Sequence, residues 1–414
     1  MRKLIAIGCL SYLLIGLAMV LTGAVLEPVI AHYGLDYKMG SLWITDQFVG
    51  YMIGVLAAPL LTSRIGKRST LVIAFGCLTV AEAAYSMLLP WSLMLIVAPL
   101  AGIGFGAAEA IVGATIIELS EENKKASNMA MLEVFFGVGA LIMPIGAAYL
   151  IHMGVWQVTF PILTAIAGIT MLLWLTLSFG KADDQIGWPS RMEAAAEQGS
   201  GAPSHAGSKS DKPVRTHGEK RKYDRSVYPF LLFGMLFFLA YVGMEMSFSN
   251  YLPSFLMQRT GAEETSAASI LSVFWLFMVI GRLFVGRIAD RIGFPVYLIL
   301  AAASTVVVLI VSALTMPFSW LVIWTCAAGL AMSGMFAVGL VYVNSRTTAG
   351  MTERTTSLMV AAGGIGGAVF PRISGWLMDS YGTTATMWSI AGMAAFMVVV
   401  FLLMAMAGKG LKAS

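Results

Sequence analysis

The sequence predicts an all-α integral membrane protein, with twelve transmembrane helices in two pseudo-symmetric six-helix halves. Three observations predict this fold class. The 414 residues are 58% hydrophobic and 12% charged, whereas soluble proteins have roughly 25% charged residues. Apolar runs of about 20 residues or more, enough to cross a bilayer, recur along the chain. Glycine, proline and arginine positions of the first half return 227 residues later, as Gly137 and Gly364 do.

Twelve apolar runs are interpreted as spanning helices, because a segment inside hydrocarbon must satisfy its own backbone hydrogen bonds. They cover residues 4–32, 40–62, 69–89, 93–118, 126–152 and 155–180, then 227–256, 266–289, 294–316, 319–345, 355–378 and 384–407. The first run follows Arg2 and Lys3. It is too long for the apolar core of a secretory signal peptide, so we interpret it as a retained helix.

A polar segment separates the two groups of helices. It is rich in Gly, Ser, Pro and mixed charge, and such a composition cannot form a hydrophobic core. We expect an N-terminal bundle over 1–180, a cytoplasmic linker over 181–226, a C-terminal bundle over 227–408 and a cytoplasmic tail over 409–414. Lys and Arg in short loops gather on one side of the predicted spans, which places both termini in the cytoplasm of a multi-pass protein of a bacterial-type cell membrane.

Glycines and prolines at matching positions suggest how the halves move. Small residues let transmembrane backbones approach closely, and proline removes a backbone donor and bends a helix. Pro144 and Pro371 occupy equivalent positions of the repeat. Two similar halves with close packing and matching bends suit a transporter that rocks about a central site.

A loop motif joins the eighth and ninth predicted spans and has a counterpart in the first half. Residues 286–293, GRIADRIG, match G-x-x-x-D-R-x-G, whereas residues 59–68 have Ser63 at the Asp position. A glycine allows close helix approach or unusual backbone angles, and an aspartate can cap a turn and pair with arginine. We expect these loops to latch helix ends in one conformation; the alternative is that they only set topology. The predicted gating residues are Arg64, Gly66, Gly286, Asp290, Arg291 and Gly293.

Carboxylates inside a membrane are costly and are therefore functional candidates. Glu109 follows a glycine run on the fourth predicted span, and Glu133 lies at similar depth on the fifth. We predict that both are proton-coupling groups, with a structural bond between helices as the alternative for Glu133. The sequence does not place Glu82, and it puts Arg282 nearer the inner surface, with the gating loops.

The seventh predicted span carries carboxylate, hydroxyl, amide and aromatic groups in YVGMEMSFSNY, residues 241–251. Sugars need convergent hydrogen-bonding groups and aromatic faces on which to stack. We therefore predict that this span lines a substrate cavity, with interhelical bonding as the alternative. Arg372 is a candidate counter-ion for the substrate. The predicted substrate-binding residues are Tyr241, Glu245, Ser247, Asn250, Tyr251 and Arg372.

Three segments and the loop motif carry a family resemblance. The segments are GFGAAEAIVG (104–113), LEVFFGVGALIMP (132–144) and YVGMEMSFSNYLPSFL (241–256). They resemble the fucose–galactose–glucose:proton symporter branch of the major facilitator superfamily, in particular bacillus-type glucose/mannose:proton symporters. The resemblance implies the major facilitator fold and a proton-coupling carboxylate on the fourth span, here Glu109. Fucose permeases of the family also use an Asp on the first span, where this sequence has Ala24.

The predicted function is proton-coupled uptake of a hexose or similar small polar solute by alternating access, driven by the proton gradient with no cofactor or metal. The alternative is proton-driven efflux of drugs or amphiphilic compounds, because 28 Met residues could line an adaptable pocket.

The sequence has no metal-binding, nucleotide-binding or nucleophile motif, so an enzyme is not expected. The net charge of +4 reflects the basic loops and gives no reason to expect nucleic acid. The expected partners are the solute, protons and lipid, and the chain is expected to be a monomer.

Overall fold

The computed structural model describes residues 2–120, 125–180, 183–186, 225–314, 317–347 and 352–411, and these ranges contain helices and no strand. The helices of the first half are α1 (Arg2–Ala24), α2 (Leu26–Tyr33), α3 (Tyr37–Ile65), α4 (Lys67–Ser86), α5 (Trp91–Leu119), α6 (Lys125–His152) and α7 (Thr159–Thr176). Those of the second half are α10 (Tyr228–Thr260), α11 (Glu264–Ile292), α12 (Phe294–Leu314), α13 (Phe318–Met332), α14 (Met335–Ser345) and α15 (Thr352–Gly408).

The predicted linker, residues 181–226, lies mostly outside the described residues. Within it the structure describes the short helix α8 (Asp183–Ile186) and the beginning of a 3₁₀ turn, Arg225–Val227. Residues 412–414 of the predicted tail are also outside the described part.

Twelve spans are present, as predicted. Eleven helical segments of the described chain are long and apolar enough to cross a membrane, and α13 and α14 together form one of them. The longest lies in α15, where Gly382 leaves helical geometry (φ 79°, ψ 176°) and divides α15 into two spans. The protein is therefore a multi-pass membrane protein.

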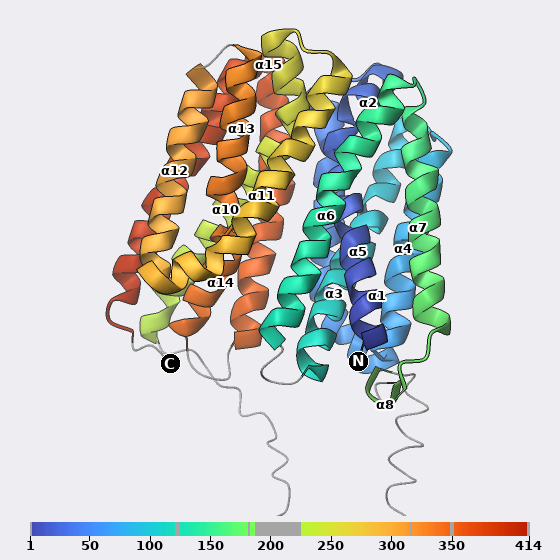
Figure 1. Ribbon diagram of the computed structural model, residues 1–414, viewed down its shortest axis with the longest axis vertical. Coiled ribbons are helices and arrows are strands. Elements are labelled where there is room, and N and C mark those ends of the chain that lie inside the picture. The colour runs from blue at the N-terminus through green and yellow to red at the C-terminus, as the bar shows by residue number, and fades with distance from the viewer. Residues whose placement is uncertain are drawn as a thin grey trace, which may run out of the picture.

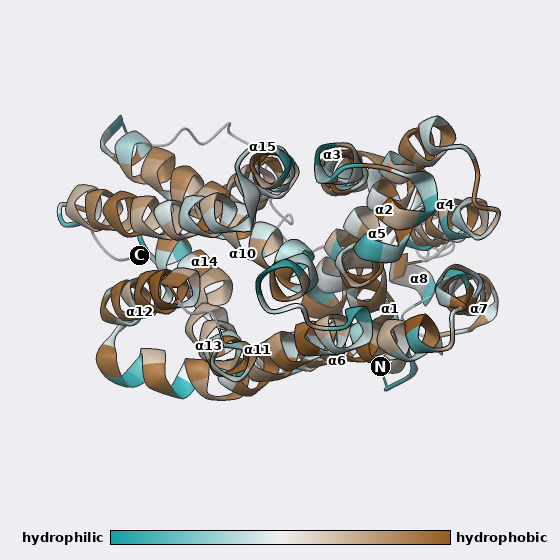
Figure 2. Ribbon diagram, turned by 90° about the horizontal axis from the view of Figure 1, so that it is seen from above, coloured by the Kyte–Doolittle hydropathy of each residue, from teal (hydrophilic) through white to brown (hydrophobic). Residues whose placement is uncertain are grey.

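The two halves meet along two helix pairs. Seen from above, α3 lies against α15 on one side, and α6 lies against α11 on the other (Figure 2). Both chain ends lie at the same end of the molecule, which we call the terminal face; the opposite end is the distal face (Figure 1). The region between the two helix pairs is where a site shared by both halves can form.

Glycines hold each half together, and they do so in equivalent ways. A Cβ on Gly102 of α5 would lie 1.9 Å from the Gln47 carbonyl oxygen of α3, and a Cβ on Gly329 of α13 would lie 2.5 Å from the Phe274 carbonyl oxygen of α11. The glycines and the partner carbonyls are both 227 residues apart. The sequence repeat is thus a repeat of backbone contacts.

Candidate transport site

Glu109 lies in a glycine-rich stretch of α5 that leaves room for two tyrosines. A Cβ on Gly106 would lie 2.6 Å from the Tyr51 carbonyl oxygen, and one on Gly113 would lie 2.7 Å from the Tyr12 hydroxyl. The Tyr12 hydroxyl donates to the backbone carbonyl of Glu109 at 3.2 Å. The Tyr51 hydroxyl lies within hydrogen-bonding reach of the Glu109 carboxylate. The glycines therefore admit the side chains that hold Glu109 in place.

Arg282 of α11 reaches from the second half to Glu133 of α6. Its Nη1 lies 3.7 Å from Glu133 Oε2, and its guanidinium stands 5.9 Å from the centre of the Phe136 ring. The two charged side chains are 25% and 43% exposed, so they keep accessible surface between the halves. Among ion pairs of the described residues, this one alone joins the halves. The prediction that Arg282 belongs with the gating loops is wrong, because it faces α6 rather than the terminal face.

The tenth span is interrupted beside Arg282, and the interruption supplies backbone acceptors. α13 ends at Met332 and α14 begins at Met335. The Tyr241 hydroxyl donates to the Met332 carbonyl at 3.0 Å, and Arg282 Nε donates to the Ser333 carbonyl at 3.4 Å. Irregular backbone at membrane depth is tolerated where it is buried in protein or lines a cavity. Broken helices of this kind form the binding sites of many transporters.

Glu245 of α10 completes a group of charges around Arg282. The Glu245 side chain lies within hydrogen-bonding reach of Tyr241, and Arg282 interacts with it electrostatically. Arg282 interacts in the same way with Glu109 and Glu133. One guanidinium of the second half therefore faces carboxylates from both halves. We call this group the central site, made up of Tyr51, Glu109, Glu133, Tyr241, Glu245 and Arg282.

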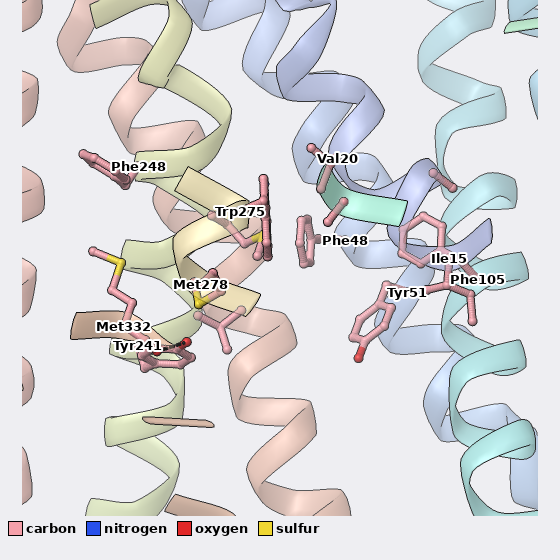
Figure 3. Close-up of a cluster of buried hydrophobic side chains, with 14 of the residues drawn as sticks. Ile15, Val20, Phe48, Tyr51, Phe105, Tyr241, Phe248, Trp275, Met278 and Met332 are labelled. Carbon is pink, nitrogen blue, oxygen red and sulfur yellow. Dashed lines mark hydrogen bonds between the residues drawn. The ribbon is translucent and has the colours of Figure 1, made fainter. Parts of the chain in front are cut away.

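Aromatic side chains lie around the central site. Figure 3 shows Phe48 and Tyr51 projecting from the first half toward Tyr241 and Trp275 of the second. Trp275 packs edge-on against Phe136, with ring centroids 6.3 Å apart, and its buried indole N–H has no hydrogen-bond partner among the described residues. Charged groups, hydroxyls, a free N–H donor and ring faces together suit a solute that carries several hydroxyl groups.

Ser247 and Asn250, which we predicted to bind substrate, lie in helix contacts. Asn250 Nδ2 donates to the Met246 carbonyl of its own helix at 2.8 Å, and a Cβ on Gly23 of α1 would lie 2.8 Å from the Asn250 Cα. Ser247 is fully buried, and its hydroxyl has no partner within the described part of the chain. Both are thus separate from the group around Arg282.

Tyr251 and Arg372 also lie away from the central site. The Tyr251 hydroxyl donates to the Pro371 carbonyl at 3.1 Å, which joins α10 to α15. Arg372 Nη1 donates to the Lys38 carbonyl at the start of α3, at 3.0 Å. The predicted counter-ion therefore bridges the halves near the distal face in this structure.

Hydrogen bonds between the halves close the distal face. The Asp379 carboxylate accepts from the backbone N–H groups of Tyr37 and Lys38, at 3.0 and 2.5 Å. Deeper in the molecule, the Thr45 hydroxyl donates to the Ala368 carbonyl at 3.0 Å. On the terminal side of the Glu133–Arg282 pair, the described residues form no hydrogen bond or ion pair between the halves.

The gating glycines differ in what they do. Gly66 and Gly293 end α3 and α11 with φ of 82° and 86°, which only glycine adopts readily. The expectation of an unusual backbone position at Gly293 is thus met. A Cβ on Gly286 would meet nothing within 4 Å. The expected close helix approach at Gly286 is therefore wrong for this conformation.

The charged gating residues are exposed on the terminal face. Arg64, Asp290 and Arg291 are all exposed, and within the described chain Asp290 makes no hydrogen bond or ion pair. The nearby carboxylate Glu118 pairs instead with Lys67, inside the first half. The latch that the motif predicts is not formed in this conformation.

Three contributors to the central site were not predicted from the sequence. They are the arginine Arg282, the tyrosines that hold Glu109, and the broken tenth span. A signal for Arg282 was present, since several membrane carboxylates need a cation and few arginines lie within predicted spans. The tyrosines could have been found only from the glycines opposite them, which requires knowing which helices are neighbours.

The two halves of six spans, with facing charges between them, define a membrane transport protein. The chain belongs to the Major Facilitator Superfamily, which matches residues 8–316 and 233–412. It is therefore a transporter and not an enzyme.

Relatives and solved structures agree with this family. The glucose/mannose transporter GlcP of Bacillus subtilis is 27% identical over 398 residues, covering 94% of this chain and 92% of that protein. The sodium-dependent glucose transporter 1A of Mus musculus is 23% identical and covers 94% and 93%. A D-xylose–proton symporter has the same fold, with a TM-score of 0.75 at 15% identity and 97% of each chain covered.

Proposed function

We propose that this protein is a proton-coupled importer of a hexose or a similar small polar solute. The observation that carries the proposal is the central site, where Arg282 pairs with Glu133 of the other half and interacts electrostatically with Glu109 and Glu245. The similarity to a glucose/mannose transporter over nearly the whole chain supports a sugar as the solute. A proton gradient supplies the energy, without a cofactor.

Each part of the site has a role in this proposal. Glu109 and Glu133 take up and release the proton. Glu245 accepts hydrogen bonds from the solute, and the Tyr241 hydroxyl oxygen, whose hydrogen is bonded to the Met332 carbonyl, is a second acceptor. The indole N–H of Trp275, which has no partner among the described residues, is a donor. Arg282 neutralises the carboxylates when they are ionised. It loses its ion-pair partner Glu133 when Glu133 gains a proton. The charge change alters the link between α6 and α11 and thereby favours movement of the halves.

The proposed cycle alternates between the two faces. With the terminal face in the cytoplasm, as the positive-inside rule predicts from the basic loops, the bonds of Asp379 would close the molecule to the outside. Under this proposal the structure corresponds to the state that releases solute to the cytoplasm. The latch around Asp290 and Arg291, with its counterpart around Arg64, would form when the halves close at that end. One chain contains the complete site, which is consistent with a monomer.

Uptake by the purified protein in liposomes tests this function. With an imposed proton gradient, acid outside, we expect accumulation of a labelled hexose, and collapse of the gradient by an ionophore should abolish it. A panel of hexoses, pentoses and lipophilic cations fixes the class of solute. Expulsion of a lipophilic cation, with no sugar accumulated, would show efflux instead.

Substitution of Glu109 tests the proton role. Because glutamine keeps the shape of glutamate but has no titratable proton, we expect Glu109→Gln to abolish gradient-driven accumulation while solute exchange across the membrane continues. Glu118→Gln is the matched control, because Glu118 lies near the end of the same helix with its side chain 63% exposed. Normal accumulation by Glu109→Gln would remove Glu109 from proton coupling.

A further inference from the structure

Glu82 of α4 is a carboxylate that the central site does not use. It is 1% exposed, and neither carboxylate oxygen has a hydrogen-bond partner among the described residues. It lies inside the first half, on a helix that packs against α5 and α7. A buried carboxylate with two unsatisfied oxygens requires an explanation.

Further unpaired polar atoms lie on the same side of α4. Tyr85, one helical turn after Glu82, is fully buried, and its hydroxyl has no partner in the described chain. The ring of Trp43 of α3 stands edge-on to Tyr85 with centroids 5.4 Å apart, and its buried indole N–H is also unpaired there. Gln47 of α3 is a further polar neighbour of Tyr85. Glu82, Tyr85, Trp43 and Gln47 form what we call the α4 polar cluster.

The cluster contains no cation to balance an ionised Glu82. None of the ion pairs between described residues includes Glu82, and its carboxylate is enclosed within the first half. Moving an isolated ionised carboxylate into a low-dielectric interior costs several kcal/mol, about what would unfold a marginally stable protein. The neutral acid avoids this cost, and it has one donor and an acceptor to offer.

The surroundings match a neutral carboxylic acid better than a metal ion. Trp43 can only donate and is a neighbour of Tyr85, so it supplies no ligand for a cation. Sodium and similar ions need several oxygen ligands, and the Gln47 oxygen already accepts from the Thr22 hydroxyl at 2.7 Å. We propose that the α4 polar cluster is a second proton-binding site, in which Glu82 carries the proton in this conformation.

The cluster is positioned to respond to movement of the halves. Thr22, bonded to Gln47, precedes Gly23, where a Cβ would lie 2.8 Å from the Cα of Asn250 in the second half. The other charged group that faces the cluster is Asp46, which interacts with Tyr85 and also with Arg372 near the distal face. Opening of the distal face would change both contacts and expose the proton on Glu82 to exchange. Binding is simple addition of a proton from water to the carboxylate, and release is its reverse.

Infrared spectroscopy of the purified protein tests this proposal without a transported solute. We expect the carbonyl-stretch band of protonated carboxylic acids at neutral pH to lose one component in Glu82→Gln and to stay unchanged in Glu118→Gln. Tyr85→Phe, which removes one hydroxyl, should shift this component without removing it, and this variant decides the question if Glu82→Gln does not fold. No difference from wild type in both Glu82→Gln and Tyr85→Phe would overturn the proposal.

Thermal melting with and without sodium separates a proton from a metal ion. If the α4 polar cluster binds a proton, sodium at constant ionic strength should change the melting temperatures of wild type and Glu82→Gln equally. Stabilisation of wild type alone by sodium would mean that a monovalent cation occupies the cluster, and the proton assignment would then be wrong.

Discussion

At the scale of single residues, the central site depends on one arginine that serves both halves. Arg282 lies 3.7 Å from Glu133 and interacts with carboxylates on α5, α6 and α10. Removing the cation from such a group leaves carboxylates that repel one another and have lost their partner. The arrangement makes Arg282 as important to the proposed function as the carboxylates that the sequence singles out.

We expect Arg282→Met to reduce gradient-driven uptake by roughly tenfold or more, since a hydrogen bond to a charged group contributes about 1.5–3 kcal/mol. Arg287→Met, an exposed arginine of the same helix, is the control and should transport normally. Adding Glu133→Gln to Arg282→Met should cost less than the sum of the separate effects. Additive losses would show that the pair does not act as a unit.

Glu27 of α2, outside the spanning segments, should make the stability of the folded protein depend on pH. Burial raises the pKa of the Glu27 carboxyl, against the opposing effect of hydrogen bonds from Ser254 and Tyr37. Tyr37 donates to the two carboxylate oxygens at 2.9 and 3.1 Å, and Glu264 is the other carboxylate that faces Glu27. A raised pKa means that the folded state holds this proton more tightly than the unfolded chain does.

The folded protein should therefore lose stability as pH rises from the ordinary glutamate range through the raised pKa of Glu27. We expect the melting temperature of wild type to fall over this window relative to that of Glu27→Gln, which has no proton to lose. Melting curves of both proteins at a series of pH values provide the measurement. A constant difference across the series would contradict this linkage.

At the scale of helices, glycine contacts set the spacing within each half. The sequence repeat predicted that glycines matter at equivalent positions, and Gly102 and Gly329 do meet equivalent backbone atoms. After these glycines the fourth and tenth spans no longer have equivalent structures. α5 continues unbroken through Glu109, whereas its counterpart breaks between α13 and α14. The first half therefore contributes a carboxylate where the second contributes backbone carbonyls.

We expect Gly102→Ala and Gly329→Ala to lower the melting temperature, because each Cβ would press on a backbone carbonyl that cannot move independently. Overpacking of this kind costs about 1–3 kcal/mol. Gly146→Ala in α6 is the control, since a Cβ there would meet nothing within 4 Å. Equal melting temperatures of all three variants would mean that α5 and α3, and α13 and α11, can move apart with little loss of stability.

At the scale of the whole molecule, one carboxylate of the second half caps a helix of the first. Asp36 accepts from the Met39 N–H at the start of α3. Asp379 accepts from the N–H groups of Tyr37 and Lys38, the two residues before Met39. The first N–H groups of a helix lack partners within the helix and attract negative charge. Because Asp379 of the second half supplies the acceptor for these N–H groups of α3, the cap also joins the two halves at the distal face.

We expect Asp379→Ala to favour opening of the distal face, whereas Asp36→Ala, which caps the same helix from its own half, should have little effect on opening. Ser41 is fully buried below this contact and reports the change. With Cys9, Cys77 and Cys326 replaced by serine, a cysteine at position 41 should react several-fold faster with a thiol reagent in Asp379→Ala. Equal labelling in the two variants would show that Asp379 does not hold the distal face closed.

The sequence by itself determined the membrane class, the twelve spans, the two related halves and the family. These follow from hydropathy and from residue spacing, which depend on local composition and on an internal repeat. It also identified Glu109, Glu133 and Glu245, because a carboxylate in an apolar run is conspicuous without any knowledge of neighbours. The tertiary structure decided which of these charges meet. It joined them through Arg282, assigned Arg372 to the distal contact and enclosed Glu82 in a separate cluster, because the facing side of each helix is fixed only when the helices pack.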